Sequence, residues 1–373
     1  MKSLKLNLFS RVLCAAMLSF GLVLTSWGGS QSNTDSNSST TNLSVSESAN
    51  CYIVLSAGSY KFRTVQGNSC TSVGSVASAE VLWEYFGTDI EPNVGDLIKS
   101  VSHSDGYIYF QTADTFKEGN AVIAAKDAFG TILWSWHIWL TDQPQGQEYY
   151  NNAGTMMDRN LGATSATPGD VGGLGLLYQW GRKDPFLGSS SISSDTLAKS
   201  TISWPSEVES TSSTGTISYA TAHPTTFIIR NDSNYDWYYT GSSSTDETRW
   251  TTSDKTKSIY DPCPAGWRVP DRRVWPKALG SSLYFDHTYS STNKGMNFSG
   301  KFGSASTIWY PASGERYSYD GGLRGVGSYG HYWSASPGGN NAYLLYLSYY
   351  GDVYPSSLYA SRAYGYSVRC LQE

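Results

Sequence analysis

The segment from Thr131 to Leu140 constrains the fold most strongly, because it alternates large apolar side chains with a period of two. The side chains on one face are Ile132, Trp134, Trp136, Ile138 and Leu140. This alternation is the pattern of a β-strand that buries one face. The preceding loop ends at Gly130, which can take the positive φ of a tight turn. The segment therefore predicts the second strand of a β-hairpin.

Five further short segments have the same β-forming character, and the break at 56–59 between the first two suggests a hairpin loop. They are Cys51–Leu55, Tyr60–Val65, Val81–Tyr85, Ile108–Thr112 and Ala121–Ala125. Short strands at this spacing are typical of a β-sandwich. We therefore predict an immunoglobulin-like β-sandwich domain over residues 51–145. Pro144 and Gly146 mark the joint to a second domain at 149–373.

The composition excludes several classes of protein. Charged residues make up 15% of the chain, against a typical value of about 25%, so neutral polar groups must cover the surface. Aromatic residues make up 14%, which is too many for a chain that is disordered throughout. The net charge of -5 argues against nucleic acid as a partner, because phosphate binding needs clustered Lys and Arg.

The N-terminal residues predict export. Lys2, Lys5 and Arg11 precede an apolar run over 12–24, which is the pattern of a signal peptide and is too short to span a bilayer. We assign the signal peptide to 1–28 and a Ser/Thr/Asn-rich tether to 29–50. Trp27 occupies the position where a lipoprotein signal needs cysteine, so the sequence argues against a lipid anchor. No later apolar run predicts a transmembrane span, and we expect an extracellular or outer-membrane-associated protein of the cell surface.

Removal of the leader would leave four cysteines, Cys51, Cys70, Cys263 and Cys370. An even number in an exported chain predicts disulfides. Four cysteines allow three sets of pairs, of which we favour Cys51–Cys70 with Cys263–Cys370, one pair in each domain. The alternative is that Cys51 and Cys70 are buried free thiols.

Six motif blocks in the second half of the chain resemble one bacterial family, the Fibrobacter succinogenes major paralogous domain. The blocks are Met157–Ala163, Gly175–Phe186, Tyr260–Pro270, Tyr310–Arg316, Tyr332–Ser336 and Gly365–Cys370. The resemblance covers nearly all of 155–373 and implies an α+β, C-type-lectin-like domain with long loops, close to sulfatase-modifying-factor domains. The first domain resembles the β-sandwich that precedes it in Bacteroidota surface proteins, some of which are fimbrillin-like adhesins or pilus tips. One position departs from the family, since Val274 replaces its usual acid.

A loop excursion at about 187–258 carries the candidate ligand-binding residues. They are Tyr235, Asp236, Trp237, Tyr238, Tyr239 and Trp250. Rigid aromatic rings beside small polar groups are typical of recognition loops and suit the faces and hydroxyls of sugars. The alternative is that this loop packs on its own domain. A second candidate is the tyrosine-rich segment 343–359, of which a strand must turn half of the rings inward.

Other residues of the motif blocks have a structural interpretation. We expect Trp180, Trp267 and Trp333 to pack in the core. The arginines of these blocks are expected to pin loops through carboxylate pairs. The arginines are Arg182, Arg268 and Arg369, with Asp158, Asp184 or Asp261 as partners. A short helix is expected from Asp271 to Leu279, where Asp271 can cap the first turn.

No motif of a hydrolase, zinc protease or nucleotide-binding loop occurs, and the sequence predicts neither a metal site nor a cofactor. We therefore predict a non-catalytic adhesin or binding protein that presents a lectin-like head to a glycan or protein ligand, with pilus subunits as further candidate partners. One alternative is a structural envelope or fimbrial subunit without a soluble ligand. The other is a carbohydrate-active enzyme.

Overall fold

A computed structural model describes residues 39–204, 207–231, 235–239, 248–251, 256–279, 287–299, 303, 307–356 and 359–373. This part of the chain is β-rich, with several sheets and few, short helices. Residues 39–373 form one compact unit. The predicted signal peptide and residues 29–38 of the predicted tether lie outside the described residues, and the predicted domain division stays a prediction. Within the described ranges, no helix combines the length and the apolar character that crossing a bilayer requires.

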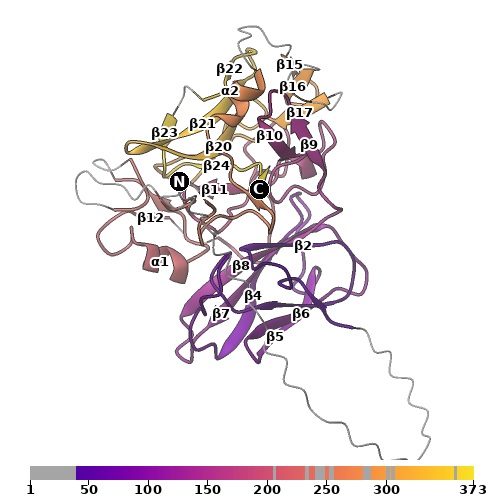
Figure 1. The fold of residues 1–373 in the computed structure, drawn as a ribbon, viewed down its shortest axis with the longest axis vertical. Helices are drawn as coiled ribbons and strands as arrows, with labels where there is room; N and C mark the ends of the chain where they lie inside the picture. The colour runs from indigo at the N-terminus through magenta and orange to yellow at the C-terminus, as the bar shows by residue number, and fades with distance from the viewer. Residues whose placement is uncertain are drawn as a thin grey trace, which may run out of the picture. The chain divides into compact units, whose positions relative to one another are not determined.

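The first hundred described residues build two four-stranded sheets (Figure 1). One sheet has the order β1 (Thr41–Asn42), β3 (Ser59–Arg63), β6 (Tyr107–Thr112) and β5 (Ile98–Ser104). The other has the order β2 (Cys51–Val54), β8 (Ile132–Leu140), β7 (Gly119–Lys126) and β4 (Ser78–Tyr85). All six predicted strands are therefore confirmed, with shifted ends.

Only one of the two predicted hairpins forms. Strands β7 and β8 pair antiparallel around the 127–130 turn, where Gly130 has a φ of 83°. The expected hairpin around 56–59 is wrong, because β2 pairs in parallel with β8 whereas β3 pairs with β6. The segment 56–59 therefore crosses from one sheet to the other.

Strand β8 is buried on both faces. Its alternate residues Trp134, Trp136, Ile138 and Leu140 lie in a cluster to which both sheets contribute. On the opposite face, Trp139 belongs to a second cluster that includes Trp180 and Trp333 of the motif blocks. His137 shares that face and contacts the Asn120 side-chain oxygen at 2.8 Å from Nε2, and burial lowers the pKa of its imidazole to about 3. The predicted burial of one face is therefore confirmed, and the opposite face is buried as well.

The rest of the chain forms smaller sheets around one large one (Figure 1). The large sheet has the order β19 (Leu323–Arg324), β18 (Glu315–Arg316), β24 (Gly365–Ser367), β20 (Tyr329–Gly338), β21 (Asn341–Ser348) and β22 (Val353–Tyr354), with β11 (Leu177–Gln179) on β24 and β23 (Tyr359–Ser361) on β21. A second sheet joins β14 (Trp267–Arg268), β25 (Leu371–Gln372), β10 (Gly154–Met157) and β9 (Gly146–Tyr149). A third joins β15 (His287–Ser290), β16 (Gly295–Ser299) and β17 (Thr307–Pro311), and β12 (Val208–Glu209) pairs with β13 (Ile228–Ile229). The helices within the described ranges are α1 (Ile217–Ala222), α2 (Val274–Leu279) and one 3-10 turn, η1 (Val171–Gly173). Helix α2 confirms the predicted helix and begins three residues after Asp271.

The motif tryptophans pack as expected, but the motif arginines do not. Trp180 and Trp333 are fully buried, and Trp267 is half-buried. The predicted Arg–Asp pairs are wrong, because these arginines donate mainly to backbone carbonyls and amide side chains. Arg182 donates to Thr226 O at 2.7 Å, Arg268 to Val269 O at 3.3 Å and Arg369 to Asn160 Oδ1 at 3.1 Å. The three carboxylates have other local partners, Asp158 with Arg159, Asp184 with Lys183, and Asp261 with the Cys263 and Val269 amides.

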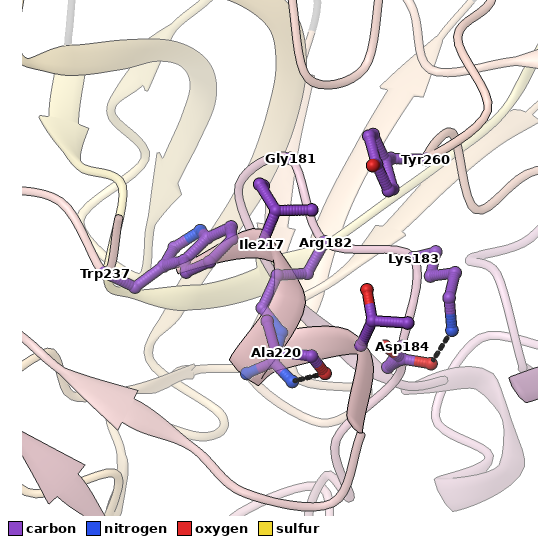
Figure 2. Close-up of a pocket in the computed structure, with 9 residues that line it drawn as sticks. Gly181, Arg182, Lys183, Asp184, Ile217, Ala220, Trp237 and Tyr260 are labelled. Carbon is purple, nitrogen blue, oxygen red and sulfur yellow. Dashed lines mark hydrogen bonds and ion pairs between the residues drawn. The ribbon is translucent and has the colours of Figure 1, made fainter. Parts of the chain in front are cut away.

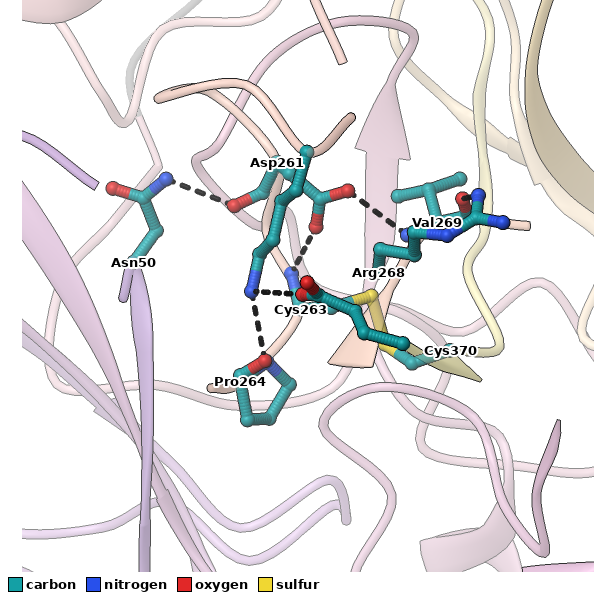
Figure 3. Close-up of a disulfide and its surroundings, with 9 residues drawn as sticks. Asn50, Asp261, Cys263, Pro264, Arg268, Val269 and Cys370 are labelled. Atoms are coloured by element: carbon teal, nitrogen blue, oxygen red, sulfur yellow. Dashed lines mark hydrogen bonds and ion pairs between the residues drawn. A yellow bond between two sulfur atoms is a disulfide. The ribbon is translucent and has the colours of Figure 1, made fainter. Parts of the chain in front are cut away.

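One predicted disulfide is confirmed. Cys263 and Cys370 are joined beside Asp261, whose carbonyl accepts a hydrogen bond from Asn50 Nδ2 at 2.9 Å (Figure 3). The favoured Cys51–Cys70 pair is wrong. Cys51 is a free thiol, buried in the second cluster on β2, whereas Cys70 lies exposed on the turn after β3 in the other sheet. The alternative of a buried free thiol is therefore confirmed for Cys51, and burial raises its pKa far above the ordinary value.

Replacement of both Cys263 and Cys370 by alanine is expected to lower the free energy of unfolding by about 4–5 kcal/mol, because the bond closes a loop of roughly 100 residues in the unfolded chain. Urea unfolding followed by tryptophan fluorescence would measure the loss. As an internal control, iodoacetamide should modify Cys51 only after unfolding. Rapid modification of Cys51 in the native protein, or an unchanged stability of the double variant, would contradict this arrangement.

Candidate ligand-binding surface

The predicted binding loop holds a buried ion cluster. Arg249 donates to both oxygens of Asp236, from Nη1 to Oδ1 at 2.9 Å and from Nη2 to Oδ2. Arg362, next to β23, adds a bond to Asp236 Oδ2 at 3.3 Å. The side chains of all three are fully buried, and both guanidinium groups lie over the Trp180 ring, at 4.8 and 4.2 Å from its centroid. Asp236 therefore fastens the loop to the core.

Two tryptophans of the same loop pack inward with their indole N–H groups satisfied. Trp237 donates to Trp180 O at 2.7 Å, and Trp250 donates to Arg182 O at 3.1 Å. Gly181 makes this packing possible, because its φ is 83° and an added Cβ would lie 2.6 Å from Arg249 Cβ. Position 181 therefore requires glycine for steric reasons.

The six predicted binding residues divide by burial. Asp236, Trp237 and Trp250 are buried, Tyr238 and Tyr239 are half-buried, and Tyr235 is 46% exposed. Three of the six therefore make internal contacts, as the packing alternative expects, and Tyr235 is the residue of this set that offers a ring to solvent. Ligand binding by these residues stays a prediction.

A cavity lies between this loop and the Arg182–Asp184 segment (Figure 2). Its volume is about 10 Å³, which is room for no more than one water molecule. The Lys183 ammonium donates to Asp184 Oδ1 at 2.6 Å and to Ser135 O at 3.1 Å. These bonds attach the Arg182–Asp184 segment to β8. This cavity is far too small for a ligand site, which typically has 300–1,000 Å³.

A continuous row of aromatic groups, exposed at its two ends and buried at its centre, lies elsewhere on the chain, and we call it the tyrosine band. Each member is in ring or cation–π contact with the next. The band consists of Tyr235, Arg230, Tyr319, Tyr317, Tyr364, Tyr366, His331, Tyr346, Tyr329, Tyr349 and Tyr350, with Tyr354 beside Tyr346. It extends from the residues after β13 across the large sheet to the β21–β22 turn.

The first part of the band is an arginine between two tyrosines. The Arg230 guanidinium lies 4.4 Å from the Tyr235 ring centroid and 4.1 Å from that of Tyr319, whose hydroxyl it also contacts. The turn 317–322 carries Tyr319, and Gly321 takes a φ of 63° there. Tyr319 is 41% exposed, so both rings offer a surface while the cation fixes their separation.

The centre of the band is buried, and it places the band member His331 beside the half-buried Glu315. His331 stacks on Tyr366 with 4.5 Å between ring centroids, and its Nε2 lies 3.7 Å from Glu315 Oε2. Tyr366 hydrogen-bonds the Glu315 carboxyl, yet burial outweighs this bond and raises the pKa of Glu315 to about 7. Burial also lowers the pKa of His331 to about 4. At neutral pH the imidazole is therefore neutral, and the contact is not a fully formed ion pair.

The last part of the band is held by a tight turn. Gly351 has a φ of 91°, and the Ser348 hydroxyl donates to Asp352 Oδ2 at 2.9 Å. The turn presents Tyr349 and Tyr350, which are 43% and 73% exposed, beside Tyr354, which is 45% exposed. Tyr350 is the most accessible ring of the band.

The second predicted segment supplies much of this surface. Tyr346, Tyr349, Tyr350 and Tyr354 belong to the band, whereas Tyr343 is half-buried beneath the Arg272 guanidinium at 4.1 Å. The Tyr359 side chain lies outside the described residues. The sequence prediction missed Tyr317 and Tyr319 after β18, Tyr329 and His331 on β20, and Tyr364 and Tyr366 at β24. Tyr317, Tyr319 and Tyr364 lie in turns outside the strands, so strand periodicity gave no signal for them.

Two further findings complete the description of the site. Among the described residues, no group of three or more His, Cys, Asp or Glu side chains is placed to hold a metal ion. Comparison of the chain with protein-family models, with curated proteins and with solved structures finds no match. The family resemblance therefore stays a prediction.

Asp236→Ala is expected to lower the free energy of unfolding by about 3–5 kcal/mol, because it removes a buried carboxylate that two buried guanidinium groups contact. The matched control is Asp320→Ala, which removes an exposed pair with Arg324, 51% exposed on both sides, and should cost about 1 kcal/mol or less. Denaturant unfolding of both variants measures the difference. Equal losses would show that the buried cluster does not hold the loop.

Glu315 is expected to make stability depend on pH. Its folded-state pKa of about 7 exceeds the ordinary value of 4.5, so the folded protein holds this proton more tightly than the unfolded chain. The resulting stabilisation is complete below pH 4.5 and is lost as the pH rises to about 7. Melting temperatures of the wild type and of Glu315→Gln should converge at low pH and diverge in favour of the variant at pH 7. Glu209→Gln, an exposed control, should follow the wild type; parallel curves for Glu315→Gln and wild type would exclude a raised pKa.

Proposed function

We propose that this protein is a non-catalytic binding protein of the cell exterior, an adhesin, that holds a glycan chain along the tyrosine band. The observation that carries this proposal is the unbroken row of aromatic contacts from Tyr235 to Tyr350, whose rings are exposed at both ends. An isolated exposed tyrosine needs no explanation, but two groups of exposed rings joined by one network of ring contacts favour an interaction surface.

The form of the band favours an extended ligand. Exposed rings lie at the two ends, and half-buried and buried rings lie between them, so a chain-like molecule long enough to span the band would contact the rings at both ends. Tyrosine offers an apolar face and a hydroxyl at a low cost in conformational entropy. These properties suit the apolar faces and hydroxyls of successive sugar units. The contacts of the rings with one another reduce the ordering that binding would require.

The finer aspects of the fold and location belong to the same proposal. The two sheets of residues 41–140 and their shared cluster support an immunoglobulin-like sandwich, and the disulfide-linked remainder supports a C-type-lectin-like head of the Fibrobacter paralogous family. The basic and apolar leader supports export to the cell surface. In this interpretation, the sandwich carries the head and the head carries the band.

A structural fimbrial or envelope subunit is the second candidate. It is favoured by apolar residues at loop positions of the first two sheets, where Phe129 is 94% and Val94 is 84% exposed. A subunit of this kind would bury such residues against another copy or a pilus protein. Sedimentation velocity over a range of concentrations would reveal self-association, and Phe129→Ser should abolish it.

The glycan proposal is tested by a glycan array with the full chain, followed by calorimetry on the best ligand. Tyr350→Ala and Tyr354→Ala are each expected to weaken binding about tenfold, the loss of an aromatic anchor at an interface. Tyr150→Ala is the matched control, because Tyr150 is 42% exposed and lies outside the band. Absence of any ligand on the array, or equal losses in all three variants, would reject the band as the binding surface.

A further inference from the structure

A second surface with binding chemistry lies on the outer face of the β1–β3–β6–β5 sheet. Alternate residues of β3 and β6 point into the core, among them Phe62 and Phe110. The residues between them face outward, in three cross-strand rows set by the register of the sheet. The rows are Ser59–Gln111–Ser100, Lys61–Tyr109–Ser102 and Arg63–Tyr107–Ser104. We call this set the serine–tyrosine face.

This face is hollowed. A depression of about 230 Å³ lies over the first two rows, lined by Ser59, Ser100, Ser102, Tyr109 and Gln111 among others. The Gln111 amide bridges the first row, donating to Ser59 Oγ at 3.2 Å and accepting from Ser100 Oγ at 3.3 Å. Within the described part of the chain, the hydroxyls of Ser102 and Tyr109 have no protein hydrogen-bond partner. The depression therefore offers hydroxyl groups that are available to a ligand.

Lysines near this face have carboxylate partners, but the lysine on the face has none among the described residues. Lys99, Lys117 and Lys126 on neighbouring strands and loops each pair with a carboxylate. Lys61 has no such partner among the described residues. Its ammonium instead lies 4.9 Å from the Tyr107 ring centroid and 5.5 Å from that of Tyr109.

The neighbouring Arg63 also lacks a carboxylate within the described ranges, and it donates to the Ser44 carbonyl at 2.8 Å. The acid beside the face is Asp105, which accepts a hydrogen bond from Ser104 at the β5–β6 turn. That turn lies at the end of the sheet opposite Ser100 and Gln111. In a chain of net charge -5, two cations without carboxylate partners beside a polar depression favour an anionic ligand.

The geometry points to the serine–tyrosine face as a second binding site, which takes an anionic saccharide. Lys61 supplies the charge for a carboxylate or sulfate group, Tyr109 supplies a ring for the sugar, and the serine and Gln111 side chains meet its hydroxyls. An acidic peptide fits less well. Peptides are commonly bound at a free strand edge, in an apolar groove or by an arginine cluster, whereas this site is the polar face of a paired sheet.

The test measures binding of the full chain to three oligosaccharides of matched length by calorimetry: sulfated heparin fragments, oligogalacturonate and neutral malto-oligosaccharide. Binding of either anionic probe is expected, and which probe binds distinguishes a sulfate from a carboxylate. The affinity should fall as the ionic strength rises from about 0.01 to 0.15 M, because the Debye length shrinks from about 30 to 8 Å. No binding of either anionic probe, or equal binding of the neutral one, would overturn the proposal.

Two variants test whether the anionic saccharide binds at the serine–tyrosine face. Lys61→Gln and Tyr109→Ala should each weaken binding roughly fivefold to tenfold, the range for a central interface residue, with the melting temperature reported as a check on folding. Lys99→Gln removes the same charge from the same sheet and should leave the affinity unchanged. An equal loss with Lys99→Gln, or tighter binding of poly-glutamate than of the saccharides, would overturn the site.

This inference does not depend on the tyrosine band. Tyr350→Ala should leave binding of the anionic probe intact, and Lys61→Gln should leave binding to the band intact. The proposals for the two surfaces can therefore be rejected independently of each other.

Discussion

The burial of strand β8 on both faces is the constraint on which the rest of the structure depends. One face brings Trp134 and Trp136 into the cluster between the first two sheets, and the other brings Trp139 against the residues after 150. Two groups on that second face bond across the contact: Ser135 Oγ donates to Asp184 Oδ1 at 2.5 Å, and Trp139 Nε1 donates to Ala163 O at 3.0 Å. A buried polar group without a partner is costly, so these bonds fix how the later chain packs.

The same packing continues outward to the candidate binding surface. Trp333 lies in the buried cluster with Trp139 and contacts Tyr366 at 4.4 Å between ring centroids, and Tyr366 belongs to the tyrosine band. The exposed rings are thus the outer end of an aromatic network whose inner end is solid core. Such support holds a binding surface in place before the ligand arrives, which lowers the entropy lost on binding.

Much of the strand content could be predicted, but the candidate site could not. Period-two alternation in 131–140 identified a strand because its signal is local. The loop at 235–250 misled the prediction, because Asp236, Trp237 and Trp250 have the composition of a recognition loop and equally that of a satisfied core. Burial decides between the two, and burial depends on Arg362 and Trp180, which are distant in the sequence. Tyr317, Tyr319 and Tyr364 lie in turns, where no local period indicates which side chains will meet.

The sequence by itself determined the strand periodicity, the 127–130 turn and the cysteines from which the Cys263–Cys370 bond is made, because these follow from local backbone preferences and residue chemistry. The tertiary structure alone decided that β2 joins β8 in parallel, that Cys51 is enclosed as a thiol, and that Lys61 lacks a carboxylate partner within the described chain. The physical reason is that each of these depends on groups brought together across long stretches of chain. Local periodicity shows which face of a strand can be buried, but not what will cover it.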